Sequence, residues 1–287
     1  MHVSVLGFGG SEIGYEGASV RTVGRLLAGA IEAGLNVIDT AECYGESETL
    51  IGKSLGTRRR DVHVFTKCGH AGGWGRPNWS VSSILASVER SLRRLATDHV
   101  DLVQLHSCSL AELERGVAIT ALERARERGL TRYIGYSGDG DAARYAVESG
   151  RFDTLQTSVN VADQEAIELT LPLALERGLG VIAKRPIANV AWRYSRKPAE
   201  AYHQTYWSRL RALDYEFLKD DATAVATALR FTLSTAGVHT AIVGTSRPER
   251  WEEDARLLDA GALPRKLYRE IRERWKAAAD NTWSGQV

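Results

Sequence analysis

The chain has 287 residues, enough for one large α/β barrel or two modest domains, and its 44% apolar and 25% charged residues are typical of a globular protein. A formal net charge of +1 gives no global field for nucleic acid or an anionic membrane surface, and no apolar run approaches the roughly 18 residues that span a bilayer. The N-terminus lacks the basic region and apolar core of a signal peptide, and an odd number of scattered cysteines, Cys43, Cys68 and Cys108, does not make a disulfide framework. We therefore expect a cytoplasmic protein with no nucleic-acid or membrane partner, whose oligomeric state the sequence does not determine.

Short apolar strands alternate with helical patterns along nearly the whole chain. The predicted strands are 3–8, 35–38, 62–66, 100–105, 131–136, 153–157, 179–183 and 239–243. Apolar residues at helical spacing lie between them, as in 20–33, 80–95, 110–128 and 222–235. The strands are apolar without alternation, which is expected of parallel strands covered on the outside by helices. Eight such units predict a single (β/α)8 TIM barrel over residues 1–287, with the active site at its C-terminal face; an open sheet with an added domain is the alternative.

Two segments stand apart from this repeat. Residues 186–219 are rich in aromatic and basic residues and look irregular, so they predict either a lid or binding loop after the seventh strand or a surface insertion with a short helix. The C-terminal segment 261–287 follows the last unit. With 70–80, these are the loops in which substrate specificity is expected to reside.

Strand after strand ends in a polar or ionisable residue. These residues are Asp39, Lys67, His106, Ser137, Gln156, Lys184 and Thr245. In a barrel of parallel strands all the C-terminal ends lie on one face, and that face carries the active site. The sequence therefore predicts that these side chains converge, with Tyr44 in the loop above Asp39.

Four of these residues suit general acid catalysis on a carbonyl group. Lys67 beside Tyr44 is expected to favour the phenolate and so to lower the pKa of the phenol, ordinarily about 10. Asp39 would keep the ammonium of Lys67 charged, and His106 would donate a hydrogen bond to the substrate oxygen or pass a proton to Tyr44. None of the four is a nucleophile suited to a carbonyl carbon, so a hydride from a reduced nicotinamide is expected.

A resemblance to the aldo-keto reductases is carried, in order, by DTAECYGESE, FTKCGH, SLRRLATDHVDLVQLH, GYSG, LQTSVN and AIVGTSRPERWEED. It covers about residues 3 to 260. The resemblance implies a (β/α)8 barrel that reduces small aldehydes or ketones with NADPH, or sometimes NADH, without a metal. By position, the catalytic residues of that family fall on Asp39, Tyr44, Lys67 and His106, with Tyr44 as the proton donor.

The resemblance also implies a cofactor site across the barrel mouth. Its residues are Gly10, Ser11, Asp39, Ser137, Gln156, Lys184, Arg185, Thr245, Ser246, Arg247, Arg250, Glu253 and Asp254. Ser137 and Gln156 would hold the nicotinamide carboxamide. The hydroxyls and arginines after the last strand suit the 2′-phosphate of NADPH.

Several positions depart from the family pattern. Gly138 and Asp254 stand where asparagine is common, Lys184 replaces an aromatic residue that stacks on the nicotinamide, and Gly244 replaces a lysine often found near the 2′-phosphate. Arg185 or the neighbouring backbone would then have to cover the nicotinamide ring. The chain also begins almost on its first strand, so the N-terminal hairpin of the family is expected to be shortened or absent.

Other functions remain open at this stage. Trp74 and Trp79 either line an apolar substrate pocket with Tyr44 and His106 or merely pack their loop. A metal-dependent hydrolase is the rival enzyme, with zinc held by residues drawn from Cys43, Cys68, His70, His106 and Cys108. An aldose or alcohol dehydrogenase working in the oxidative direction and a non-catalytic NADPH sensor are the further alternatives.

Overall fold

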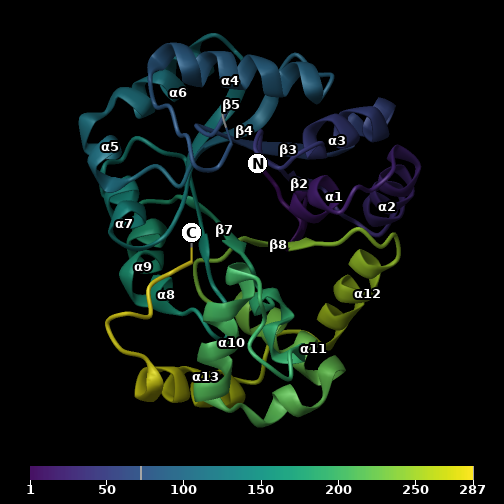
Figure 1. The fold of residues 1–287 in the computed structure, drawn as a ribbon, viewed down its shortest axis with the longest axis vertical. Coiled ribbons are helices and arrows are strands. Elements are labelled where there is room, and N and C mark those ends of the chain that lie inside the picture. Colours follow the sequence, from purple (N-terminus) through teal and green to yellow (C-terminus); the bar gives the residue numbers. More distant parts are fainter. Residues whose placement is uncertain (72, 287) are drawn as a thin grey trace.

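The computed structural model describes residues 1–71 and 73–286, and in them eight parallel strands close into a barrel in sequence order (Figure 1). The strands are β1 (Leu6–Gly9), β2 (Val37–Asp39), β3 (His63–Cys68), β4 (Val100–His106), β5 (Thr131–Ser137), β6 (Thr154–Ser158), β7 (Gly180–Lys184) and β8 (Thr240–Gly244). The predicted (β/α)8 barrel is confirmed, and the open-sheet alternative is wrong. Every predicted strand is present, with its ends shifted by three residues at most.

Helices surround the barrel. They are α1 (Ser11–Tyr15), α2 (Val20–Glu32), α3 (Ser47–Leu55), α4 (Val81–Arg94), α5 (Leu110–Arg115), α6 (Val117–Glu127), α7 (Gly140–Glu148), α8 (Glu165–Leu169), α9 (Leu171–Glu176), α10 (Ala201–Leu213), α11 (Asp221–Leu233), α12 (Arg250–Arg256) and α13 (Arg265–Ala278), with 3-10 turns η1 (Gly56–Asp61), η2 (Ala188–Arg193), η3 (Glu216–Lys219) and η4 (Leu257–Ala260). The predicted helix 110–128 is divided in two because Gly116 lies in the left-handed region, at φ 72°. None of the described helices is both long and apolar enough to cross a bilayer.

The barrel interior has an apolar layer below and a polar layer above. Val37, Phe65, Leu102 and Ile182 form the buried apolar layer, one from each of β2, β3, β4 and β7. Side chains two residues further along a strand point to the same side. The inward positions above this layer are therefore Asp39, Lys67, Gln104 and Lys184, and β4 adds His106 one step higher. The ionisable groups of the interior therefore lie toward the C-terminal mouth.

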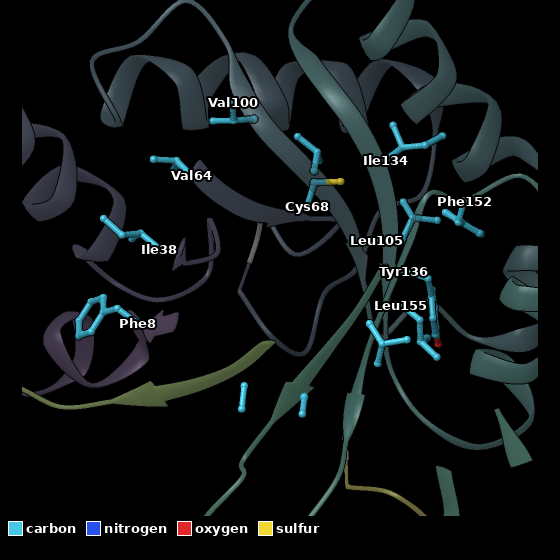
Figure 2. Packing of buried hydrophobic residues seen from close by; sticks show 14 of the residues in the cluster. Phe8, Ile38, Val64, Cys68, Val100, Leu105, Ile134, Tyr136, Phe152 and Leu155 are labelled. Carbon is cyan, nitrogen blue, oxygen red and sulfur yellow. The ribbon is translucent and has the colours of Figure 1, made fainter. Parts of the chain in front are cut away.

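The alternate strand residues pack outward against the helices. Figure 2 shows part of this cluster, including Phe8, Ile38, Val64, Leu105 and Leu155, all of which are fully buried. Burying apolar side chains on both faces of the strands stabilises them by roughly 25 cal/mol per Å² removed from water. It also explains the nearly continuous apolar strand sequences.

The segment 186–219 contains a 13-residue helix, α10, so the predicted insertion with a helix describes it better than an irregular loop, although the helix is longer than predicted. One face of α10 packs with α11 and α13 in a second apolar cluster, to which it contributes Tyr206, Leu210 and Leu213. A surface cavity of about 370 Å³ opens beside α10, outside the barrel mouth, with Trp192 and Trp207 in its lining.

The N-terminal residues lead directly into β1, and the C-terminal residues return to the barrel. Residues 1–5 form no strand ahead of β1, in agreement with the expected lack of an N-terminal hairpin. After α13 the chain turns back, and the yellow trace in Figure 1 runs toward the strands. Residues 284–286 make hydrogen bonds there, which are described below.

Candidate active site

A buried ion pair lies at the top of the polar layer. The ammonium of Lys67 contacts Asp39 and donates to the carbonyl oxygen of Thr40 at 2.9 Å, and both ionic side chains are only 1% exposed. The other carboxylate oxygen of Asp39 accepts from Gln156 at 2.8 Å and from Gln104 at 3.3 Å. Because a buried charge is costly without partners, these contacts hold the pair in one geometry.

Tyr44 lies over this ion pair. The Lys67 nitrogen is 5.0 Å from the centre of the phenol ring, and the ring meets that of His106 edge-on with 5.6 Å between centres. The loop that carries Tyr44 is fixed by its main chain, because Thr40 donates to the carbonyl oxygen of Phe65 and Tyr44 to that of Ala41. Asp39, Tyr44, Lys67 and His106 therefore converge as predicted from their positions at strand ends.

The pKa of the Tyr44 phenol is raised well above its ordinary value, and the expectation that Lys67 would lower it is wrong. Burial disfavours the phenolate, and the negative charge of Asp39 adds to that effect. The cation of Lys67 is in contact with Asp39, so the pair presents little net positive charge to the phenol. The hydroxyl of Tyr44 is thus fully protonated at neutral pH.

His106 is held neutral. Its pKa lies well below the ordinary value because burial disfavours the charged ring and because electrostatic repulsion from Lys67, His70, Lys184 and Arg185 adds to that effect. Its Nδ1 lies 3.4 Å from the sulfur of Cys43. Trp74 packs edge-on against the imidazole, with 4.7 Å between ring centres.

The loop after β3 is organised by His70. Its Nε2 lies 2.7 Å from the carbonyl oxygen of His106, and its ring stacks on Trp74 with 4.6 Å between centres. Trp79 packs on Gly69 and the edge of His70. Trp74, half exposed, therefore borders the site, whereas Trp79 lies against the loop and the outer core.

Ser137 and Gln156 lie side by side at the mouth, where the Ser137 hydroxyl donates to the Gln156 side-chain oxygen at 3.1 Å. The structure explains why glycine follows Ser137. A Cβ on Gly138 would come within 2.4 to 2.7 Å of the Tyr136 ring, whose hydroxyl donates to the carbonyl oxygen of Cys108. The ring thus occupies the space that an asparagine side chain would need.

Lys184 and Arg185 face the C-terminal tail, residues 284–286. The carbonyl oxygen of Gln286 accepts from Lys184 at 2.9 Å, from Arg185, and from the hydroxyl of Ser158 at 3.2 Å. Lys184 also pairs with Asp139 at 2.7 Å. Arg185 holds a left-handed backbone conformation, φ 55°, which costs energy in a non-glycine residue.

The tail also makes hydrogen bonds with charged side chains that are buried or half-buried. Gln286 donates to Asp163, Gly285 to Glu165, and the carbonyl oxygen of Ser284 accepts from Arg209. Tyr202, from α10, adjoins this region because the Arg185 guanidinium lies 5.3 Å from its ring centre. The segment 186–219 thus brings at least one side chain to the mouth.

Where β1 and β8 meet, the strand ends are glycines and contribute no side chains to the site. Gly9 pairs with Gly244, and Gly10 donates to the carbonyl oxygen of Asp39 at 2.8 Å. The space above Gly244 belongs to Glu12, because a Cβ there would lie 1.8 Å from its carboxylate. The hydroxyl of Ser11 donates to the same carboxylate at 2.7 Å.

The residues after β8 form a polar group with several carboxylates. Ser246 donates to Glu16, and Thr245 accepts from the main-chain N–H of Arg247 at 3.0 Å. Arg250 lies 3.2 Å from Glu253 and 3.6 Å from Asp254. Burial raises the pKa of Asp254 to about 6.

The cysteines and histidines of the zinc alternative have separate contacts. Cys43 meets His106, whereas Cys68 contacts the carbonyl oxygen of Gln104 at 3.6 Å. Within residues 1–71 and 73–286, no group of three or more His, Cys, Asp or Glu side chains is arranged to hold a metal ion.

Three contributors to the mouth, Gln104, Tyr202 and Gln286, were missed in the sequence, and Cys43 was named only as a possible zinc ligand. Gln104 could have been found, because it lies two residues before His106 on the same strand face. Cys43 adjoins Tyr44 in the chain, but its contact with His106 depends on the loop conformation. Tyr202 and Gln286 reach the mouth through tertiary packing, for which no local pattern exists.

Known proteins are similar to this chain in fold and in sequence. The family model described as "Aldo/keto reductase family" matches residues 5–276. D-threo-aldose 1-dehydrogenase from Pseudomonas sp is 27% identical over 94% of each chain, and the uncharacterized oxidoreductase YqkF from Bacillus subtilis (strain 168) is 26% identical over 96% of this chain and 94% of that protein. The holo form of aldo-keto reductase AKR11C1 from Bacillus halodurans superposes with a TM-score of 0.83 at 27% identity, covering 99% of this chain and 96% of that one. The chain therefore belongs to the aldo/keto reductase family and is an oxidoreductase.

Proposed function

We propose that this oxidoreductase reduces a small aldehyde or ketone to an alcohol with NADPH, and that Tyr44 donates the proton. Family members generally use NADP(H) and act on small carbonyl substrates. The observation that supports the proposal is the convergence of a protonated phenol, a neutral imidazole and a buried ion pair at the barrel mouth. This arrangement can bind a carbonyl oxygen and protonate it as negative charge develops.

In the proposed mechanism the bound cofactor supplies a hydride to the carbonyl carbon. The hydroxyl of Tyr44 donates its proton to the carbonyl oxygen, which becomes the alcohol. A raised pKa does not prevent this transfer, because the alkoxide forming on the substrate is a far stronger base than a phenolate. His106 donates a second hydrogen bond to the same oxygen, and the Asp39–Lys67 pair fixes the position of the phenol.

The residues at the mouth fit a nicotinamide dinucleotide. Gly9 and Gly244 leave adjacent strand ends without side chains, so a flat ligand could approach the main chain there once the Glu12 carboxylate moves from the space above Gly244. The side chains of Ser137 and Gln156 offer the hydrogen-bond donors and acceptors that a carboxamide requires. To bind it they would give up the hydrogen bond that they make with each other.

The 2′-phosphate of NADPH would bind Arg247 and Arg250. Both arginines face Glu253: Arg247 is largely exposed and lies 4.0 Å from its carboxylate, whereas Arg250 is less exposed and lies 3.2 Å from it. Glu16, Glu253 and the half-buried Glu12 add negative charge on this side of the mouth, which favours NADH as the alternative cofactor. Titration of the protein with each nucleotide, followed by tryptophan fluorescence, distinguishes the two by their dissociation constants.

Oxidation of a sugar or alcohol is the second candidate. It is favoured by the relative named D-threo-aldose 1-dehydrogenase, which matches nearly the full length of the chain. The same residues serve the reverse reaction, in which Tyr44 accepts the proton. Initial rates of reduction with an aldehyde panel, and initial rates of oxidation with an aldose panel, show which direction the enzyme favours.

Tyr44→Phe tests the central role. The substitution removes only the hydroxyl, so we expect carbonyl reduction to fall by about 10²- to 10⁴-fold while nucleotide binding stays unchanged. Tyr145→Phe is the matched control, because Tyr145 lies on α7 and packs against the outer apolar cluster, and the activity of this variant should remain near wild type. Unchanged turnover in Tyr44→Phe would show that another group delivers the proton.

A further inference from the structure

The contact between Cys43 and His106 is fixed by the loop that carries the cysteine. The sulfur lies 3.4 Å from Nδ1 of His106. The carbonyl oxygen of Cys43 accepts from the hydroxyl of Tyr15 at 2.9 Å, and the neighbouring Glu42 donates its main-chain N–H to the carbonyl oxygen of Lys67 at 3.2 Å. With the main chain held on both sides, the Cα of Cys43 stays beside the imidazole, and in the observed rotamer the sulfur faces Nδ1.

The protonation states decide which partner donates. Burial raises the pKa of the Cys43 thiol to about 11, so the sulfur carries its proton at neutral pH. The pKa of His106 is lowered by burial and nearby cations, so the ring is neutral, with one N–H and one lone pair. An imidazole lone pair is a better acceptor than a thiol sulfur, and S–H therefore donates to Nδ1.

We propose that Cys43 is a positioning residue for His106: its thiol donates to Nδ1 and so keeps the single imidazole proton on Nε2, the nitrogen left to bind the substrate oxygen. The catalytic consequence rests on the proposed carbonyl reduction, whereas the tautomer itself does not. A hydrogen bond at one ring nitrogen fixes the proton on the other in the same way at many histidine sites.

The other neighbours of His106 cannot set its tautomer. His70 bonds to the main-chain oxygen of His106, and Trp74 packs on the ring by its edge. Among residues 1–71 and 73–286, Cys43 is the one group within hydrogen-bond distance of a ring nitrogen of His106. Removing the thiol should therefore leave the two neutral tautomers closer in energy.

Nuclear magnetic resonance of the nucleotide-free protein measures this directly. With ¹⁵N-labelled histidine, long-range ¹H–¹⁵N correlations distinguish protonated from unprotonated ring nitrogens, and His106→Gln identifies the signals of His106 among the seven histidines. We expect Nε2 to be protonated in the wild type, a mixture of tautomers in Cys43→Ala and Cys43→Val, and recovery of the Nε2–H form in Cys43→Ser. Cys108→Ser is the control, because that buried cysteine has its own surroundings near Tyr136.

Two results would overturn the proposal: a proton on Nδ1 in the wild type, or an unchanged tautomer ratio in both Cys43→Ala and Cys43→Val. Thermal unfolding of each variant checks that the fold is intact, and the valine variant preserves side-chain volume if alanine does not fold. In the same variants kcat for carbonyl reduction should fall roughly three- to tenfold, the effect of one ordinary hydrogen bond, with partial recovery in Cys43→Ser. If the tautomer shifts as expected but the wild type reduces no carbonyl with NADPH or NADH, the positioning role stands and the proposed function fails.

Discussion

The pKa of Tyr44 shows that a neighbouring ion pair and a neighbouring cation affect a phenol differently. Lys67 is close enough to stabilise a phenolate, yet Asp39 lies beside it and repels the same phenolate. Sequence position predicted that these three residues would meet. It did not predict the sign of the pKa shift, because the sign depends on the distances of both charges from the phenol oxygen and on the loss of water around it.

The raised pKa of Tyr44 predicts different pH profiles for the two reaction directions. Reduction uses the phenol, which stays protonated, so its kcat should be nearly constant between about pH 7 and pH 9. Oxidation needs the phenolate, so its kcat should increase with pH over the same range. Rates in both directions with one aldehyde–alcohol pair test this. A reductive rate that falls with a midpoint below about pH 9 would contradict a raised Tyr44 pKa.

At the scale of elements, β8 and α1 share the space above Gly244. Because a Cβ at this position would overlap only the carboxylate end of the flexible Glu12 side chain, which can move aside, Gly244→Ala should lower the free energy of unfolding by no more than about 1 kcal/mol. In a Glu12→Ala background the same change should cost much less. Urea unfolding of the two single variants and the double variant gives the coupling energy. Additive effects would show that Glu12 does not occupy that space.

The strands could be predicted more fully than the segment 186–219. Most strands are apolar over most of their length, and all but β1 have a polar residue at or next to their C-terminal end; both patterns are local. A helix in that segment was one of two alternatives, but the bounds of α10 were not predicted, because its buried face mixes Tyr206, Leu210 and Leu213 with the buried Arg209, which obscures the helical spacing of apolar residues. The converging strand ends followed from barrel geometry, whereas Cys43, Tyr202 and the tail depend on contacts between distant parts of the chain.

At the scale of the whole molecule, residues 284–286 join α13 to the barrel mouth. Removing the chain from Ser284 onward takes the carbonyl acceptors from Lys184 and Arg209 and the N–H donors from Asp163 and Glu165. We expect the free energy of unfolding to fall by about 1–3 kcal/mol.

Gly285→Ala is a milder variant of the same experiment. An added Cβ would lie 2.3 to 2.7 Å from Asp139, so the tail should be displaced without being removed. Its unfolding midpoint in urea should lie between those of the wild type and the truncated chain. If both variants unfold at the wild-type urea concentration, the tail does not bind the mouth in solution.

Barrel closure has a consequence for the route by which the chain reaches this structure. The last seam joins Leu6 to Ala241 and Gly9 to Gly244, so it forms only after almost the entire sequence has been ordered. Until then β1 and β8 are unpaired edges that can pair with those of another copy, and the entropy of closing so long a loop slows the productive step. We expect refolding from urea to give a lower yield of native protein as the protein concentration rises. Light scattering should detect the missing protein as aggregates. A yield independent of concentration would mean that the seam is formed early.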